Sequence, residues 1–176
     1  MEVTVGIDIG FKNFGICIVN YKTNTDWKII KWDILNLGIK KNSSLVNISI
    51  AVKNILLVYC NNLIITNVII EQQPKKRIIM ERILMCCIDY FTYCHMKSKI
   101  QLMKSQDKFD VCPGTICPKG SKNYSNRKDL SIVVGKLCID DKLNTNINTH
   151  PHYKKLDDLY DALLMILSFH KYRYIN

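Results

Sequence analysis

The chain has 176 residues, of which 48% are hydrophobic and 23% are charged, and its formal net charge is +10. This length predicts a single domain with a sizeable core, over residues 1–176. The composition excludes a disordered chain, and no apolar run is long enough to span a bilayer. The positive charge favours a polyanionic partner, with nucleic acid as the first candidate and an anionic membrane surface as the second.

The eight cysteines do not indicate a disulfide framework. Six of them lie in apolar segments, where a free cysteine behaves as a small hydrophobe, and no C-x-x-C pair suggests a zinc site. The first residues lack the secretory pattern of a basic segment, an apolar core and a cleavage site. We therefore expect reduced thiols, as in a reducing compartment.

The N-terminal part of the chain predicts three antiparallel strands. VTVGIDIG is a β-branched apolar run that ends in glycine, FGICIVNY is a second apolar run, and WKIIKWDIL alternates apolar and polar residues. The short connections predict a meander, with the first hairpin turn between Asp8 and Gly15.

The middle of the chain predicts a helix, a buried strand and a second helix. Apolar residues recur at helical spacing from Leu45 to Tyr59, after a serine cap. LIITNVIIE is apolar almost throughout, which is typical of a parallel strand covered on both faces, and it ends in Glu71. The next helix, residues 78–97, has apolar residues on more than one face, so a partner subunit is a candidate for its second side.

The last part predicts one more strand and two helices. DKFDVCP is the expected strand, GTICPKGSKNYSNRK is a basic loop, Asp129 to Asp140 is a helix, and LDDLYDALLMILSFHKY is the closing helix. The resulting order predicts an α/β fold. Its mixed five-stranded sheet, an antiparallel meander plus parallel strands, is flanked by helices.

Two acidic residues accompany the apolar strands: Asp8 lies inside the first predicted strand, and Glu71 lies at the end of LIITNVIIE. If the strands of Asp8 and Glu71 are neighbours, the two carboxylates lie within a few ångströms and repel unless cations separate them. Magnesium prefers oxygen ligands, and two such ions roughly 4 Å apart can clamp the attacking and leaving oxygens of a phosphodiester. The pattern therefore indicates a divalent-metal site.

The closing helix adds further carboxylates. Asp158 and Asp161 are three residues apart and share one helix face, while Asp157 is four residues before Asp161 and is not excluded by spacing. Each acid also has a structural explanation. Asp8 could accept turn amides, Glu71 could be a surface residue, and first-turn acids complement a helix dipole.

Three motifs in this order resemble known nucleases. GIDIGFKNFGICIV resembles the first hairpin of RNase H-like nucleases, VIIEQQP resembles the fourth-strand motif of RuvC-type resolvases, and KKLDDLYDALLMIL resembles their closing helix. With the basic Ser-Asn-Arg-Lys segment ahead of the acid pair, the set is most similar to the poxvirus Holliday junction resolvases, over nearly the whole chain.

The resemblance implies an RNase H-like fold and a structure-selective endonuclease that resolves four-way and related branched DNA by paired symmetric nicks, leaving 5′-phosphate ends. It implies metal binding by Asp8, Glu71, Asp158 and Asp161, with two Mg²⁺ ions per active site and Mn²⁺ as a substitute. Lys128 resembles the essential basic residue near the scissile phosphate, and Asp157 fits the family spacing less well. The implied setting is viral DNA replication, concatemer resolution and recombination in the host cytoplasm.

Two matching nicks in a two-fold symmetric junction call for a homodimer, which we expect to form through the helix at residues 78–97. Phe11, Phe14 and Tyr124 are candidates to stack on unpaired bases, although Phe14 equally suits a core. Phosphate contacts should weaken with salt. The candidate phosphate-binding residues are Lys75, Lys76, Arg77, Lys119, Lys122, Arg127 and Lys128.

Two other classes of protein share part of this pattern. Actin-like ATPases also open with an Asp-x-Gly hairpin, but they need a second copy of the domain and further glycine-rich loops, and this chain has 7 glycines. A non-catalytic branched-DNA-binding module with the same fold is the second alternative. It differs from a nuclease in binding junctions without cutting them when magnesium or manganese is present.

Overall fold

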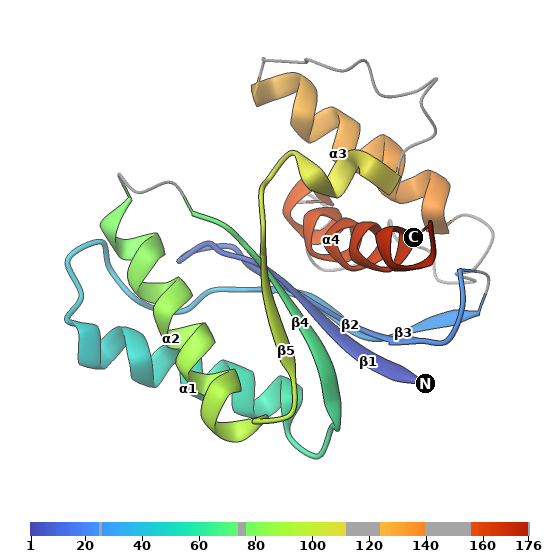
Figure 1. Cartoon of the computed structure of the whole chain (residues 1–176). Helices are drawn as coiled ribbons and strands as arrows, with labels where there is room; N and C mark the ends of the chain where they lie inside the picture. The colour runs from blue at the N-terminus through green and yellow to red at the C-terminus, as the bar shows by residue number, and fades with distance from the viewer. Residues whose placement is uncertain (25, 74–76, 112–123, 140–155, 176) are drawn as a thin grey trace.

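The computed structural model describes residues 1–24, 26–73, 77–111, 124–139 and 156–175. After an initial meander, helices and strands alternate as far as residue 103, and the described elements that follow are helical (Figure 1). In chain order the elements are β1 (Glu2–Asp8), β2 (Phe14–Tyr21), β3 (Trp27–Leu35), α1 (Leu45–Cys60), β4 (Ile65–Glu71), α2 (Ile78–Cys94), β5 (Lys99–Met103), the 3₁₀ helix η1 (Asp107–Val111), α3 (Tyr124–Ile139) and α4 (Leu156–Ile175).

The strands form one mixed sheet in the order β3-β2-β1-β4-β5. β1, β2 and β3 pair antiparallel, and β4 pairs parallel with both β1 and β5. This confirms the predicted sheet of a meander plus parallel strands. Ser44 is the cap of α1, where its side chain accepts a hydrogen bond from the backbone N–H of Asn47.

The position of the fifth strand was predicted wrongly. β5 is Lys99–Met103, and DKFDV, where the strand was expected, forms η1 instead. β5 is a short edge strand with mostly exposed side chains, so it lacks the continuous apolar pattern of a central strand. α2 also ends at Cys94, before the predicted residue 97, and α3 begins at Tyr124 rather than at Asp129.

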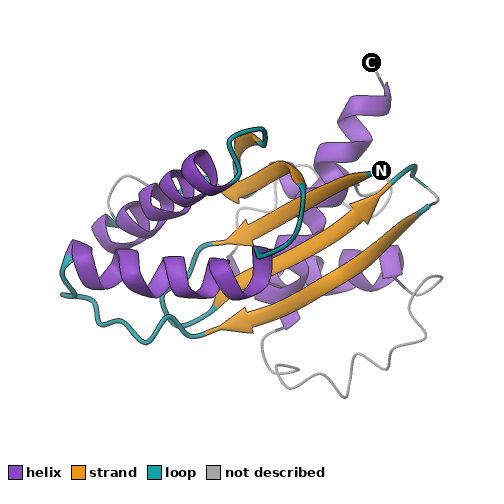
Figure 2. Ribbon diagram, turned by 90° about the horizontal axis from the view of Figure 1, so that it is seen from below, coloured by secondary structure: helices purple, strands orange, loops and turns teal. Residues whose placement is uncertain are grey.

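Helices cover both faces of the sheet. α1 and α2 lie together on one face, and α3 and α4 lie on the other (Figures 1 and 2). Alternate residues of β1 therefore enter different cores: Val5 and Ile7 pack toward α1 and α2, whereas Gly6 lies against α4. By the same alternation Asp8 faces the α4 side.

The side chains of α4 from residue 156 to residue 170 are mostly buried, because this part of the helix lies between the sheet, α3 and η1. The indole N–H of Trp32 donates to the backbone oxygen of Leu159 at 2.7 Å, which ties α4 to β3. Close backbone approach is possible because glycine faces the helix at two points. A Cβ at Gly6 would lie 2.2 Å from the Ala162 carbonyl oxygen, and one at Gly135 would lie 2.0 Å from Tyr160 Cδ1.

The described part of the chain contains no helix that is long and apolar enough to cross a membrane. The six described cysteines are free thiols. Cys112 and Cys117 lie outside the described residues.

Replacing Gly6 with alanine should destabilise the protein, because the new methyl group meets the backbone of α4. We expect a loss of about 3 kcal/mol in the free energy of unfolding, at the upper end of over-packing costs. Urea denaturation measures this loss in the free energy of unfolding. The control is Gly38→Ala, where no atom lies within 4 Å of the added Cβ and only the positive φ of 66° is penalised. That control should lose roughly 1 kcal/mol, and an equal loss in both variants would contradict the packing argument.

Candidate active site

Two carboxylates stand side by side where parallel strands end. Asp8 is the last residue of β1 and Glu71 is the last residue of β4. Ile7 pairs with Ile70 in the register of the two strands, so the acids that follow them are neighbours. The sheet therefore brings together the two acids that the sequence motifs singled out.

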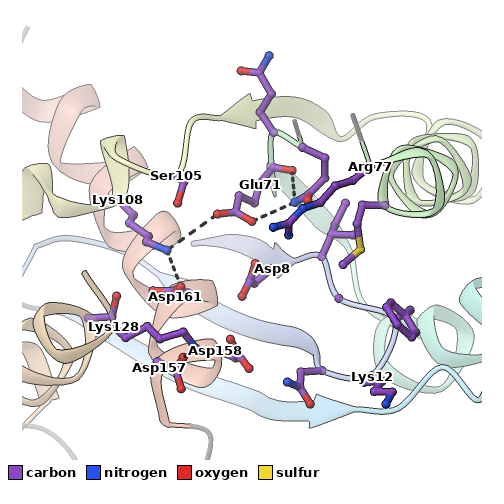
Figure 3. Close-up of a pocket in the computed structure, with 18 residues that line it drawn as sticks. Asp8, Lys12, Glu71, Arg77, Ser105, Lys108, Lys128, Asp157, Asp158 and Asp161 are labelled. Carbon is purple, nitrogen blue, oxygen red and sulfur yellow. Dashed lines mark hydrogen bonds and ion pairs between the residues drawn. The ribbon is translucent and has the colours of Figure 1, made fainter. Parts of the chain in front are cut away.

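α4 contributes three more carboxylates, which lie near the ends of β1 and β4. Asp157, Asp158 and Asp161 lie in its first two turns and line a cleft of about 440 Å³ with Asp8 and Glu71 (Figure 3). We call this the acidic cleft. A Cβ at Gly15 would lie 2.8 Å from the Asp158 carbonyl oxygen and 3.3 Å from Asp8 Cβ. The start of α4 thus rests directly beside β1 and β2.

Glu71 is held from two sides. The Gln73 side-chain amide donates to Glu71 Oε2 at 3.0 Å, and the ammonium of Lys108 lies 4.0 Å from Glu71 Oε1. Gln73 belongs to the Glu-Gln-Gln sequence that follows β4, so this part of the motif orients the carboxylate.

Lys108 is a member of the site that sequence reasoning missed. It lies in η1, is 4% exposed, and its Nζ is 2.5 Å from Asp161 Oδ2. Figure 3 shows its side chain reaching between Glu71 and Asp161. Nothing in the local sequence indicates this role, because both partners are distant in the chain.

The acids repel one another inside the fold. Burial raises the pKa of Asp8 well above its ordinary value, repulsion from Glu71 and Asp161 raises it further, and Lys108 only partly offsets the shift. Burial also raises the pKa of Asp161, against the attraction of Lys108 and a hydrogen bond with Ser131. Burial lowers the pKa of Lys108, but Asp161, Asp8 and Glu71 outweigh it, so the net shift is upward.

The donor set has the chemistry that a divalent metal requires. The side chains are carboxylates, which hard cations prefer, and Asp161 Oδ1 is buried without a hydrogen-bond partner among the described residues. As the side chains stand, no group of three or more His, Cys, Asp or Glu within the described ranges is arranged to hold a metal ion. The cation that Asp161 contacts is Lys108.

Lys128 also lines the cleft, and it pairs with the carboxylate of Asp157. Asp157 is 8% exposed and begins the acidic run of α4, whereas Asp158 and Asp161 lie nearer to Asp8 and Glu71 (Figure 3). Asp157, which fits the family spacing less well than Asp158, therefore forms an ion pair with a lysine in this structure.

The remaining candidates are partly placed. Arg77 and Phe11 line the cleft, and so does Lys12, which the sequence analysis did not single out. Phe14 is fully buried in the core. Arg127 and Tyr124 lie in the first turn of α3, where the structure describes only the backbone. The candidates outside the described residues are Lys75, Lys76, Lys119 and Lys122.

The fold is similar to that of RuvC-type resolvases. A Fowlpox virus resolvase solved with substrate Holliday junction DNA is 23% identical, with 98% of this chain and 99% of that chain covered and a TM-score of 0.71. Thermus thermophilus RuvC with a Holliday junction substrate is 11% identical, with 100% and 97% covered and a TM-score of 0.68. The yeast mitochondrial Holliday junction resolvase Ydc2 is 17% identical, with 98% and 81% covered and a TM-score of 0.62.

The sequence itself defines the family. Residues 2–172 match the model of the Poxvirus A22 protein family, and the chain belongs to that family. The sequence has no significant match among curated proteins. These findings confirm the resemblance and the fold that the three motifs predicted.

The crowding of carboxylates predicts that Asp8 costs stability when no metal is bound. A raised pKa in the folded state means that stability falls as pH rises from about 4, the unfolded value, to the folded value. Asp8→Asn should therefore raise the melting temperature in EDTA near neutral pH, by about 2–4 °C for each kcal/mol recovered. The gain should shrink toward about pH 4.

Thermal unfolding followed by circular dichroism measures this effect. Asp26→Asn is the control, because Asp26 is an exposed acid whose pairing with Lys22 is worth little. A lower melting temperature for Asp8→Asn than for Asp26→Asn, at neutral pH and without metal, would contradict the account.

Proposed function

We propose that this protein is a metal-dependent endonuclease that resolves four-way junctions and related branched DNA by paired, symmetric nicks. The observation that carries the proposal is the acidic cleft, where carboxylates from β1, β4 and α4 meet beside basic side chains. Membership of the Poxvirus A22 family and the likeness to resolvases solved with junction DNA support it. We place its action in viral DNA replication and recombination, in the host cytoplasm.

Asp8, Glu71, Asp158 and Asp161 are the residues that would hold magnesium, two ions per site. Bound magnesium supplies activation of the attacking water and stabilisation of charge on the phosphate and the departing 3′ oxygen. Gln73 keeps Glu71 oriented toward the cleft. The products would carry 5′-phosphate and 3′-hydroxyl ends.

Lys128 would meet the scissile phosphate. Its ammonium is partly exposed at the edge of the cleft, so it can reach a DNA backbone, and Asp157 anchors it there. A positioned cation next to a phosphate stabilises negative charge as it develops in the transition state. Arg77 and Lys12 extend the basic rim of the same cleft. Binding should therefore depend on phosphates and branch shape more than on base sequence.

A homodimer would supply the two active sites that two symmetric nicks require. One side of α2 packs into the protomer's own core, as the fully buried Ile83 shows, so a partner would have to contact another side of the helix. α2 presents instead a stripe of exposed apolar residues two helical turns apart: Ile78 (64% exposed), Met85 (51%) and Tyr93 (78%). This stripe is the proposed dimer surface.

Cleavage of a labelled mobile four-way junction with magnesium tests the function. We expect wild type to produce paired symmetric nicks, and Asp8→Asn to bind the junction without cutting it. Lys128→Met should bind with similar affinity but cut about 10²-fold more slowly, because one phosphate-stabilising group is lost. Cleavage rates from denaturing gels and binding from fluorescence anisotropy give both quantities.

Lys136→Met is the matched control, because Lys136 is an exposed lysine of the same helix, α3. It should cut at the wild-type rate. If wild type binds junctions but never cuts them with magnesium or manganese, the protein is a branched-DNA-binding module. If Lys128→Met cuts like wild type, the role of Lys128 is wrong.

Charges placed on the α2 stripe should separate the protomers. The variant Met85→Glu with Tyr93→Glu should sediment as a folded monomer, because a carboxylate in an apolar interface is costly. Val46→Glu with Val58→Glu is the control on the exposed face of α1, where the two residues are 66% and 71% exposed. It should remain dimeric. A dimeric α2 variant, or a monomeric α1 variant, would contradict the assignment.

A further inference from the structure

Lys108 is the most deeply enclosed cation of the acidic cleft. Its side chain is 5% exposed, and its ammonium lies 2.5 Å from Asp161 Oδ2 and 4.0 Å from Glu71 Oε1. Asp161 and Glu71 are two of the four proposed metal ligands. Lys128, by contrast, is 36% exposed and pairs with Asp157, about one helical turn before Asp161 in α4.

The backbone of Lys108 is fixed in place. The Ser168 hydroxyl of α4 donates to the Asp107 carbonyl oxygen at 2.7 Å, and η1 packs against α4. The strand before η1 is also anchored, because the Gln72 N–H donates to the Met103 carbonyl oxygen at 2.8 Å. The lysine therefore reaches the carboxylates from a rigid position next to both acidic elements.

A buried lysine is stable only when its charge is compensated. Here Asp161, Glu71 and the nearby Asp8 compensate it, and together they keep the pKa of Lys108 raised, so the ammonium stays charged. The reverse also holds: the ammonium reduces the repulsion among the three carboxylates. A divalent cation in the cleft would bind the same carboxylate oxygen atoms.

We propose that Lys108 is a positioning residue and internal counter-ion of the acidic cleft, which holds Asp161 and Glu71 in place and competes with divalent metal for their oxygens. The inference rests on the proposed function, because it assumes that these acids bind metal. Metal binding then displaces the ammonium from Asp161. The lysine stabilises the metal-free protein and raises the concentration of divalent metal that is needed to occupy the cleft.

The variant Lys108→Met removes the charge and keeps an unbranched side chain. In EDTA it should melt at a lower temperature than wild type, because the carboxylates lose their counter-ion. It should nevertheless bind Mn²⁺ more tightly, roughly tenfold, because the competing charge is gone. Isothermal titration calorimetry, at one pH for all variants, measures the affinity without DNA.

Lys104→Met is the matched control. Lys104 is exposed and precedes η1, so this variant has the same net charge without touching the cleft. It should show wild-type melting and wild-type Mn²⁺ affinity. Equal or weaker Mn²⁺ binding by Lys108→Met than by Lys104→Met overturns the proposal. If wild type itself binds no Mn²⁺, the proposed function fails as well, and the two failures are thus distinguishable.

A measurement on wild type covers the case in which Lys108→Met does not fold. In protein labelled with ¹⁵N-lysine, the buried ammonium should give a slowly exchanging NMR signal, which Lys108→Arg lacks. Addition of Mg²⁺ should shift or broaden that signal and leave the signals of exposed lysines unchanged. A Lys108 signal that stays constant through saturation with Mg²⁺ overturns the proposal.

Discussion

Carboxylates repel one another at the C-terminal ends of two inner strands of the sheet, and the contacts around them must offset that repulsion. β1 and β4 run parallel and end in Asp8 and Glu71, and α4 brings Asp161 over the same point. Such an arrangement persists only if other contacts stabilise it. The two helix-covered faces of the sheet provide them, and the lysines of η1 and α3 offset part of the charge.

The burial of α4 holds its acids in place despite their repulsion. A helix that packs on the sheet, on α3 and on η1 cannot shift to relieve its acids, and Gly6 lets its backbone approach β1 closely. Stability and function are opposed at this point, since the groups that would bind metal are the ones whose burial costs free energy. A bound divalent cation would remove that cost, which links metal binding to the stability of the fold.

Much of this was predictable from sequence, because the signals were local. The apolar runs of β1, β2 and β4 and the alternation of β3 predicted their strands, and acids within or at the ends of such runs marked the site. β5 and Lys108 were missed for a physical reason. An exposed edge strand such as β5 needs no continuous apolar pattern. The role of Lys108 depends on its contacts with Asp161 and Glu71, which are remote in sequence and adjacent in space.

If the acidic cleft binds divalent cations beside the DNA backbone, anomalous diffraction from crystals grown with Mn²⁺ should locate those cations in the cleft. We expect anomalous peaks within bonding distance of Asp8, Glu71, Asp158 and Asp161, with the Lys108 ammonium moved away from Asp161. Well-ordered crystals with no peak in the cleft, or with manganese bound only elsewhere on the surface, would contradict it.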